Sequence, residues 1–190
     1  MRRIPTPIND LVLIEPMVFS DARGHFFETF HSAKLQALGI AENFVQANQS
    51  ASHQGVLRGL HFQRPPHAQS KLIRTLSGKI FDVAVDLRRD SPWYGKWFGT
   101  ELSAENRLML YIPAGFAHGF LALASAEVLY YCGHAGYERA SEGGLRWDDP
   151  AVGIAWPSGF EITINDRDRG FPTLNEIEPI ISTVSINYES

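Results

Sequence analysis

The stretch KLIRTLSGKIFDVAVDLR, residues 71–88, decides the fold class of this chain. Its second half carries large apolar residues at every other position from 81 to 87, which is the period of a half-buried β-strand. The pair Ser77-Gly78 lies between the two apolar halves and is a turn signal. The stretch therefore predicts a β-hairpin that turns at Ser77-Gly78.

The same pattern of short apolar runs separated by turn residues extends to both sides. Helix is scarce, and SAKLQALG at 32–39 is the one candidate, with Ser32 as its N-cap and Gly39 as its terminator. No repeat or break in composition marks a second domain, so we expect one all-β domain over residues 1–190, a closed or sandwich-like barrel. The further strand-like runs are 11–19, 24–30, 107–113, 119–125 and 127–132.

Composition excludes several classes of protein. The chain has 190 residues, 44% of them hydrophobic, and a net charge of −4, so it can bury one sizeable core and offers no general attraction to nucleic acid. Cys132 is the only cysteine, which excludes an internal disulfide and favours a reducing compartment. No apolar run approaches the length of a membrane span, and MRRIPTPINDL at the N-terminus does not predict a secretory signal. We therefore expect a cytoplasmic protein that does not bind membranes.

The common motifs for phosphate binding and nucleophilic catalysis are absent. The sequence has no G-x-G-x-x-G, no P-loop and no G-x-S-x-G elbow. Its seven histidines are scattered without a His-x-His or His-x-x-x-His pair. His61 and His118 could meet in space, but two histidines leave a metal site short of ligands. We expect no bound metal.

The stretch GVLRGLHFQ, residues 55–63, places Arg58 and His61 in a strand-like segment, and Lys71 opens the next one. A charged or titrating group in a half-buried strand is costly unless it is paired. Taken singly, His61 also fits a buried core histidine and Lys71 an exposed strand end. Strict alternation puts Arg58 and His61 on opposite faces, so a shared pocket requires a bulge at Gly59 or a cover over the face with Arg58.

Two further stretches carry candidate polar residues. IPAGFAHGF, residues 112–120, leads through a Pro-x-Gly turn to His118, and VLYYCGHAGY supplies Tyr130, Tyr131 and Tyr137. Each stretch also has a structural interpretation, since a histidine can cap a hairpin and strand tyrosines often lie at the edge of a core.

Together these stretches resemble the dTDP-4-dehydrorhamnose 3,5-epimerase family. The resemblance implies an all-β, cupin-like jelly roll and an isomerase that needs no metal and no cofactor. It also implies epimerisation of dTDP-4-dehydro-6-deoxy-D-glucose at C3 and C5, which yields dTDP-4-dehydro-L-rhamnose. The segments that carry the resemblance, in this order, are 21–30, 44–63, 69–92, 102–120 and 141–157.

The resemblance implies a set of catalytic residues that suits the chemistry of a 4-keto sugar. The hydrogens at C3 and C5 are weakly acidic because both carbons neighbour the carbonyl. His61 would be the base, since histidine titrates near neutral pH, and Asp168 would orient its ring. Lys71 would place positive charge beside the developing enolate.

The acid should be a tyrosine on the far side of the sugar, and two neighbours compete for the role. Ungapped spacing from His61 to Asp168 points to Tyr131, whereas local similarity to the family's Ala-Glu-x-Leu-Tyr pattern points to Tyr130. The two side chains point to opposite faces of a strand, so only one can reach the sugar. We favour Tyr131 because it preserves the whole register.

The resemblance also implies the residues that bind the substrate. Arginines would face the diphosphate, because the guanidinium fork matches phosphate oxygens, and an aromatic ring would stack on thymine. The implied cations are Arg23, Arg58 and Arg167; the polar contacts are Glu28, Gln46, Asn48 and Glu142; His118 would line the sugar pocket, Tyr137 would stack on thymine and Phe26 would pack nearby.

Several alternatives remain open at this point. The same base and acid would serve an enzyme that inverts C3 or C5 alone, in rhamnose formation or in the synthesis of other deoxysugars. A sugar-nucleotide-binding cupin without turnover would keep the pocket and lose the base or the acid, and a metal-dependent cupin would need ligands not evident here. The family resemblance implies a homodimer, in which the N-terminal strands with Arg23 and Glu28 complete the neighbour's site.

Overall fold

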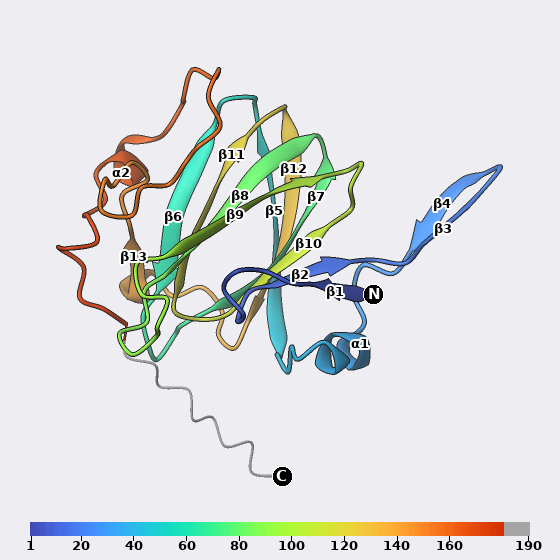
Figure 1. Ribbon diagram of the computed structural model, residues 1–190, viewed down its shortest axis with the longest axis horizontal. Helices are drawn as coiled ribbons and strands as arrows, with labels where there is room; N and C mark the ends of the chain where they lie inside the picture. Colours follow the sequence, from blue (N-terminus) through green and yellow to red (C-terminus); the bar gives the residue numbers. More distant parts are fainter. Residues whose placement is uncertain (181–190) are drawn as a thin grey trace, which may run out of the picture.

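Two antiparallel β-sheets face each other at the centre of the molecule, as the ribbon in Figure 1 shows. The computed structural model describes residues 1–180. One sheet has the strand order β1-β2-β10-β7-β12-β5 and the other has the order β13-β6-β11-β8-β9. This arrangement confirms the expected all-β, cupin-like jelly roll. The first sheet contains β1 (Arg2–Ile4), β2 (Val12–Glu15), β5 (Phe44–Ser52), β7 (Ser70–Ser77), β10 (Met109–Ile112) and β12 (Ala126–Gly133); the second contains β6 (Leu57–Gln63), β8 (Lys79–Asp86), β9 (Trp97–Ser103), β11 (Phe116–Ala122) and β13 (Glu142–Gly144).

Apolar side chains from both sheets meet in a shared core. Ile73 and Val128 of the first sheet pack in one buried cluster with Ile80 and Phe120 of the second. The inward-facing residues alternate with outward-facing ones along each strand, so successive residues contribute side chains to opposite faces of the sheet. Tyr130 packs against the same cluster and also lines the cavity described below. The apolar core therefore borders the polar site directly.

The expected hairpin over 71–88 is wrong, although both of its strands are present. β7 pairs with β10 and β12, whereas β8 pairs with β11 and β9 in the facing sheet. Only Gly78 separates the two strands, and this link is too short for the two-residue loop of a hairpin. Gly78 has a φ of +70°, and a Cβ there would lie 1.9 Å from the carbonyl oxygen of Ser125. The chain therefore crosses from one sheet to the other at this glycine.

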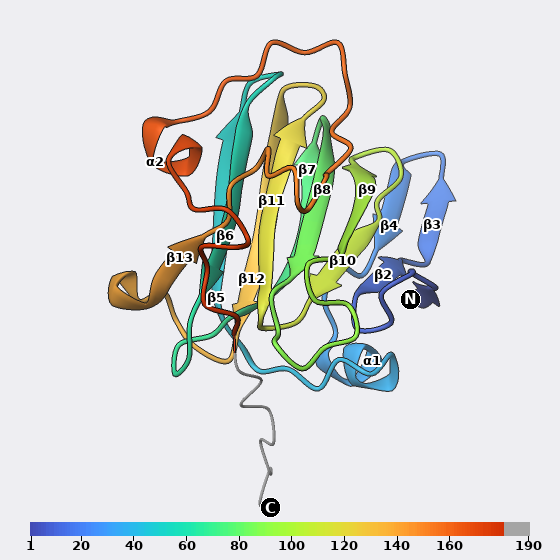
Figure 2. The same ribbon diagram turned by 60° about the vertical axis from the view of Figure 1, so that its left-hand side comes forward.

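The predicted apolar face of β8 is confirmed, and it points away from the space between the sheets. Val83, Val85 and Leu87 are fully buried in a second cluster with Leu174 and other residues of the C-terminal segment. Figure 2 shows this segment crossing the outer side of the five-stranded sheet. It contains the short helix α2 (Asp166–Arg169), whose first turn is capped by the Asn165 side chain. The outer layer thereby brings α2 next to β6.

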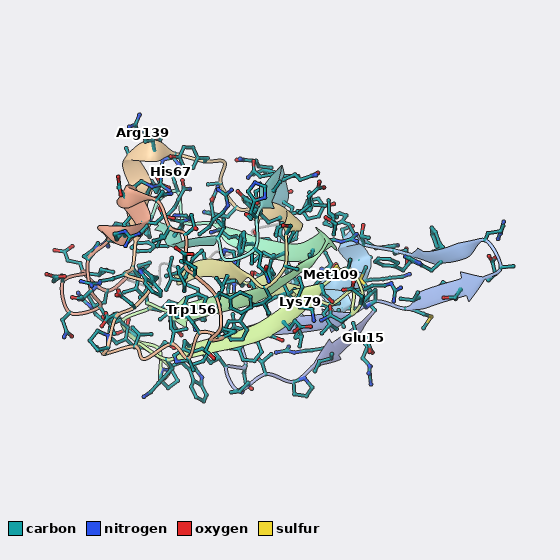
Figure 3. The ribbon with its side chains drawn as sticks, turned by 90° about the horizontal axis from the view of Figure 1, so that it is seen from above. Glu15, His67, Lys79, Met109, Arg139 and Trp156 are labelled. Carbon is teal, nitrogen blue, oxygen red and sulfur yellow. The ribbon has the colours of Figure 1, made fainter. Side chains whose placement is uncertain are left out.

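A two-stranded hairpin projects from the sandwich near the N-terminus (Figure 1). Its strands β3 (Val18–Asp21) and β4 (Gly24–Phe27) pair with each other and belong to neither large sheet. Figure 3 shows the hairpin extending away from the end of the molecule that carries Arg139 and His67. The single run predicted over 11–19 is divided by Pro16, which cannot donate a ladder hydrogen bond.

The predicted helix is present as α1 (Ser32–Ala37), with one correction at its start. His31 rather than Ser32 is the N-cap residue, and no side chain caps the first turn. Gly39 follows the helix with a φ of +89°, a conformation typical of a residue that ends a helix.

Three expected strands lie where the sequence placed them. The runs 107–113, 119–125 and 127–132 contain or overlap β10, β11 and β12. Within residues 1–180, no helix is long and apolar enough to cross a membrane. The prediction of one domain over residues 1–190 also covers 181–190, which lie outside the described part of the chain, and it stays a prediction.

Candidate active site

A bulge in β6 brings Arg58 and His61 to the same side of their strand. His118 of β11 lies opposite His61 and Phe120 lies opposite Arg58, so the register shifts by one residue between the two pairs. Gly59 has a φ of +130°, and a Cβ there would lie 2.6 Å from the Cα of the facing Gly119. Only glycine fits this close approach of two strands. The bulge expected at Gly59 is therefore present.

Both side chains open into a cavity of about 560 Å³ between the two sheets. This volume falls in the range of sites that bind small molecules. The walls come from β5, β7 and β12 on one side, from β6, β11 and β13 on the other, and from α2 at the rim. Ten of the predicted site residues line it: Gln46, Asn48, Arg58, His61, Lys71, His118, Tyr130, Tyr137, Glu142 and Arg167.

Asp168 lies behind His61 and forms a buried pair with it. Its Oδ2 is 2.9 Å from His61 Nε2, and its side chain is 1% exposed. Burial alone would raise the pKa of Asp168, but hydrogen bonds from His61, the Gly59 backbone N–H and Arg167 outweigh this and lower the pKa to about 2. The carboxylate can then only accept a hydrogen bond, so His61 Nε2 carries the hydrogen and Nδ1 carries the lone pair.

Charged and polar side chains form a connected rim around the cavity mouth. Arg167 donates to both oxygens of Glu142 at 3.2 Å and to Asp168 at 3.1 Å. Its Nη2 also lies 3.1 Å from His61 Nε2, but a nitrogen that donates to Asp168 has no lone pair left to accept from arginine. Tyr137 donates from its hydroxyl to Glu142, at 3.1 Å, and its backbone N–H donates to Gln46. The rim thus presents a guanidinium, a carboxylate and an aromatic ring together.

Lys71 and His118 lie deeper, on facing sheets. Burial lowers the pKa of Lys71, and electrostatic interactions with Cys132, Asp82 and Glu142 oppose this effect. Burial likewise lowers the pKa of His118, although Asp82 Oδ2 accepts a hydrogen bond from its Nε2 at 2.9 Å. At neutral pH His118 is therefore a neutral imidazole with its hydrogen on Nε2.

The structure corrects the preference for Tyr131, because Tyr130 lines the cavity and Tyr131 does not. Successive residues of β12 point to opposite faces of the sheet. The Tyr131 ring packs on the outer face, with its centroid 5.3 Å from that of Phe30 and 6.1 Å from that of Phe44. Burial raises the pKa of Tyr130, so its phenol keeps its proton well above neutral pH.

Arg23, Phe26 and Glu28, which were expected to bind substrate, lie outside this cavity. Arg23 is on the projecting hairpin and pairs with Asp21 at 2.6 Å. Phe26 is on the same hairpin, with 67% of its surface exposed. Glu28 follows the hairpin and pairs with Lys34 of α1. The hairpin extends away from the sandwich, so these residues do not reach the cavity of their own chain.

The cavity also contains residues that the sequence reasoning missed. Ser50 could have been predicted from the sequence, because it follows Gln46 and Asn48 on β5 with the same spacing of two residues. Gln63 could have been found in the same way, two residues after His61. No local pattern marks the others, which come from separate strands and loops. The missed residues are Gln49, Ser50, Phe62, Gln63, Gln69, Phe120 and Cys132 in the wall, and Asp82 behind His118.

The fold and this polar cavity define a cupin-like jelly roll built to hold a small anionic ligand. The family model for dTDP-4-dehydrorhamnose 3,5-epimerase matches residues 5–176, and the chain belongs to this family. A relative of that name from Methanothermobacter thermautotrophicus is 48% identical over 92% of this chain and 95% of its own.

Solved structures show the same relationship. A dTDP-6-deoxy-D-glucose-3,5-epimerase from Legionella pneumophila, solved in complex with dTDP-4-keto-L-rhamnose, has a TM-score of 0.89 and 42% identity, and the match covers 93% of this chain and 94% of that one. A 3'-monoepimerase from Streptomyces bikiniensis, solved in complex with dTDP-quinovose, has a TM-score of 0.83 and 36% identity, with 90% and 87% of the two chains covered.

Proposed function

We propose that this chain is an epimerase that converts dTDP-4-dehydro-6-deoxy-D-glucose into dTDP-4-dehydro-L-rhamnose by inverting C3 and C5. The observation that carries the proposal is the placement of His61 and Tyr130. His61 enters the cavity from β6 of one sheet, and Tyr130 enters it from β12 of the facing sheet. Inversion at carbon needs a base on one face and an acid on the other, and this arrangement supplies both.

The first step is removal of the hydrogen at C3 or C5. Nδ1 of His61 carries the lone pair that takes the proton, because Nε2 is committed to Asp168. The bond pair left on carbon moves into the ring as an enolate, with negative charge on the C4 oxygen. Asp168 stabilises the imidazolium that forms and holds its orientation.

The second step is protonation of the same carbon from the opposite face. Tyr130 keeps its hydroxyl proton in its buried position and can deliver it to the enolate. The Lys71 ammonium supplies positive charge for the C4 oxygen while the enolate exists. After each inversion, His61 has gained one proton and Tyr130 has lost one, so exchange with solvent restores both groups for the second carbon.

The rim of the cavity is suited to the dTDP moiety. Arg58 and Arg167 line it and can each donate two parallel hydrogen bonds to phosphate oxygens. Tyr137, which is 55% exposed, offers its ring as a stacking surface for thymine. Gln46 and Asn48 hydrogen-bond to each other on β5 and can turn their free polar atoms toward the base.

This mechanism uses proton transfer alone and requires no metal or redox cofactor. Among residues 1–180, no three histidine, cysteine or acidic side chains come together as a metal site. The expectation of a cofactor-independent enzyme stays a prediction. A cytoplasmic location is part of the same proposal, supported by the single cysteine, which fits a reducing compartment.

The direct test is proton exchange measured by NMR, with dTDP-4-dehydro-6-deoxy-D-glucose in deuterated water. We expect deuterium at both C3 and C5 and the appearance of dTDP-4-dehydro-L-rhamnose. Deuterium at one carbon only would replace the proposal with a single-centre epimerase. Tight binding of the substrate without any exchange would leave a sugar-nucleotide-binding protein.

We also propose that the protein is a homodimer in which the β3–β4 hairpin of one chain completes the cavity of the other. The hairpin exposes Met17, Phe19 and Phe26, each with more than half of its surface accessible. Apolar side chains gathered on a projecting element favour burial against another molecule. Such a contact would bring Arg23 and Phe26 to a partner's cavity.

A mixing experiment tests this arrangement. Arg23→Ala and His61→Ala each lower activity when made alone, the first by weakening substrate binding and the second by removing the base. Co-expression should restore about a quarter of wild-type activity, because half of randomly formed dimers are mixed and one of their two sites combines an intact hairpin with an intact base. If each hairpin served its own chain, the mixed dimer would contain no intact site and no activity would return. Sedimentation analysis of the wild type checks the dimer itself.

A further inference from the structure

Asp82 is a buried carboxylate behind the cavity wall, and the mechanism described so far gives it no role. Asp82 is on β8, and its side chain is fully buried between the sheets. Oδ2 accepts the hydrogen bond from His118, whereas Oδ1 has no hydrogen-bond partner among residues 1–180. An unsatisfied buried carboxylate oxygen is costly unless a positive charge compensates it.

Lys71 of the facing sheet is the complementary group, because it carries a positive charge in the same cavity without a paired carboxylate among the described residues. It lies in a desolvated part of the cavity, and within the described chain no carboxylate contacts its ammonium directly. The groups that act on it electrostatically are Cys132, Asp82 and Glu142. The other titratable residues that line the cavity are His118, His61, Tyr130, Tyr137, Arg58 and Arg167.

Asp82 is the one of these three groups that is free to balance the charge of Lys71. Burial raises the pKa of the Cys132 thiol, so it is neutral at neutral pH. Glu142 already accepts hydrogen bonds from Arg167 and Tyr137. Asp82 is bonded to a neutral imidazole and makes no salt bridge to lysine or arginine within residues 1–180.

We propose that Asp82 is a positioning residue for the epimerisation and acts through Lys71. Its buried negative charge keeps the Lys71 ammonium charged at the place where the enolate oxygen forms, while Oδ2 holds the His118 ring. This role rests on the proposed function. It extends that function by a residue that touches neither the substrate nor the reacting atoms.

Asp82→Asn separates the two parts of this role. The amide oxygen can still accept from His118 Nε2, so the ring stays in place and only the charge is lost. We expect dTDP to bind within about threefold of wild type, kcat to fall about tenfold or more, and the basic limb of the kcat–pH profile to move to lower pH. The limb moves in this direction because Lys71, without the carboxylate, gives up its proton more easily.

Asp86→Asn is the matched control. Asp86 lies on the same strand and is also fully buried, but it pairs with Arg88 at 2.6 Å and does not line the cavity. This variant should lose stability without a shift of the pH profile. The same behaviour in Asp82→Asn would overturn the proposal and leave Asp82 as part of the core.

A double-mutant cycle with Lys71→Met provides a second criterion. If Asp82 acts through Lys71, Asp82→Asn changes the remaining exchange rate by less than about twofold in the Lys71→Met background. An equal loss in both backgrounds would contradict the proposal. If Asp82→Asn does not fold, Asp82→Ser removes the charge without adding volume and serves in the same cycle. Wild-type protein that exchanges no deuterium would instead refute the epimerase function itself.

Discussion

His61→Ala is expected to lower kcat/KM for epimerisation by about 10³-fold, because it removes the base that we propose takes the proton from C3 and C5. The wild-type ring is held by the buried Asp168 carboxylate, so no water in its place would have the same orientation or basicity. The measurement is the rate of deuterium incorporation at C3 and C5 by NMR. dTDP should bind to the variant within a few-fold of wild type, since we propose that the rim residues hold the nucleotide.

His53→Ala is the control for this experiment. His53 is exposed just after β5 and does not line the cavity, so its removal should leave the exchange rate within about twofold of wild type. Exchange at both carbons in His61→Ala at the wild-type rate would show that another group is the base.

Tyr130→Phe is expected to separate exchange from inversion. His61 can still remove a proton and return deuterium to the same face of the enolate, so deuterium should enter the substrate. Delivery to the opposite face requires the Tyr130 hydroxyl, and formation of the inverted product should fall by about 10² to 10³-fold. Product stereochemistry and deuterium content can be followed in the same NMR sample.

Tyr131→Phe is a control of matched chemistry, one residue away on the same strand. Its hydroxyl lies on the outer face of the sheet, where its ring packs with Phe30 and Phe44, so inversion should continue at nearly the wild-type rate. Loss of inversion in Tyr131→Phe, with normal inversion in Tyr130→Phe, would reverse the assignment of the acid.

The sequence predicted strands far better than it predicted their partners. Alternation over 81–87 identified the buried outer face of β8, because a period of two depends only on the strand itself. It could not show that β7 and β8 lie in opposite sheets. That outcome depends on a link of one residue, Gly78, and on ladders with strands that are distant in sequence.

The choice between Tyr130 and Tyr131 shows why counting residues can mislead. The ungapped distance from His61 favoured Tyr131, but loop lengths between strands do not determine which face a residue occupies. The face is determined by pairing within the sheet, where Tyr130 lies between Asn48 of β5 and Ile73 of β7. The local family pattern around the strand was therefore the better guide.

Some of the site was beyond sequence reasoning for a different reason. Asp82 is one of two acidic residues in β8, and its position behind His118, opposite the strand of Lys71, becomes visible only when β8 faces β7 across the sandwich. Arg23 and Phe26 were expected at the site, yet they lie on the projecting hairpin, and they would reach a cavity only in the dimer that we propose. Neither relationship is encoded in the spacing of residues along one chain.

The placement of His61 and Tyr130 on two facing sheets has a consequence for how this scaffold can change. Packed β-sheets lie about 10 Å apart, and side chains from both sheets line the cavity between them. The separation of these two walls is set by the apolar core that holds the sheets together, not by the loops around the mouth of the cavity. Sequence changes in the loops can thus alter access to the cavity while the separation of His61 and Tyr130 stays constant. We therefore expect the stereochemical course of the proposed reaction to depend on how the two sheets pack and to tolerate variation in the loops.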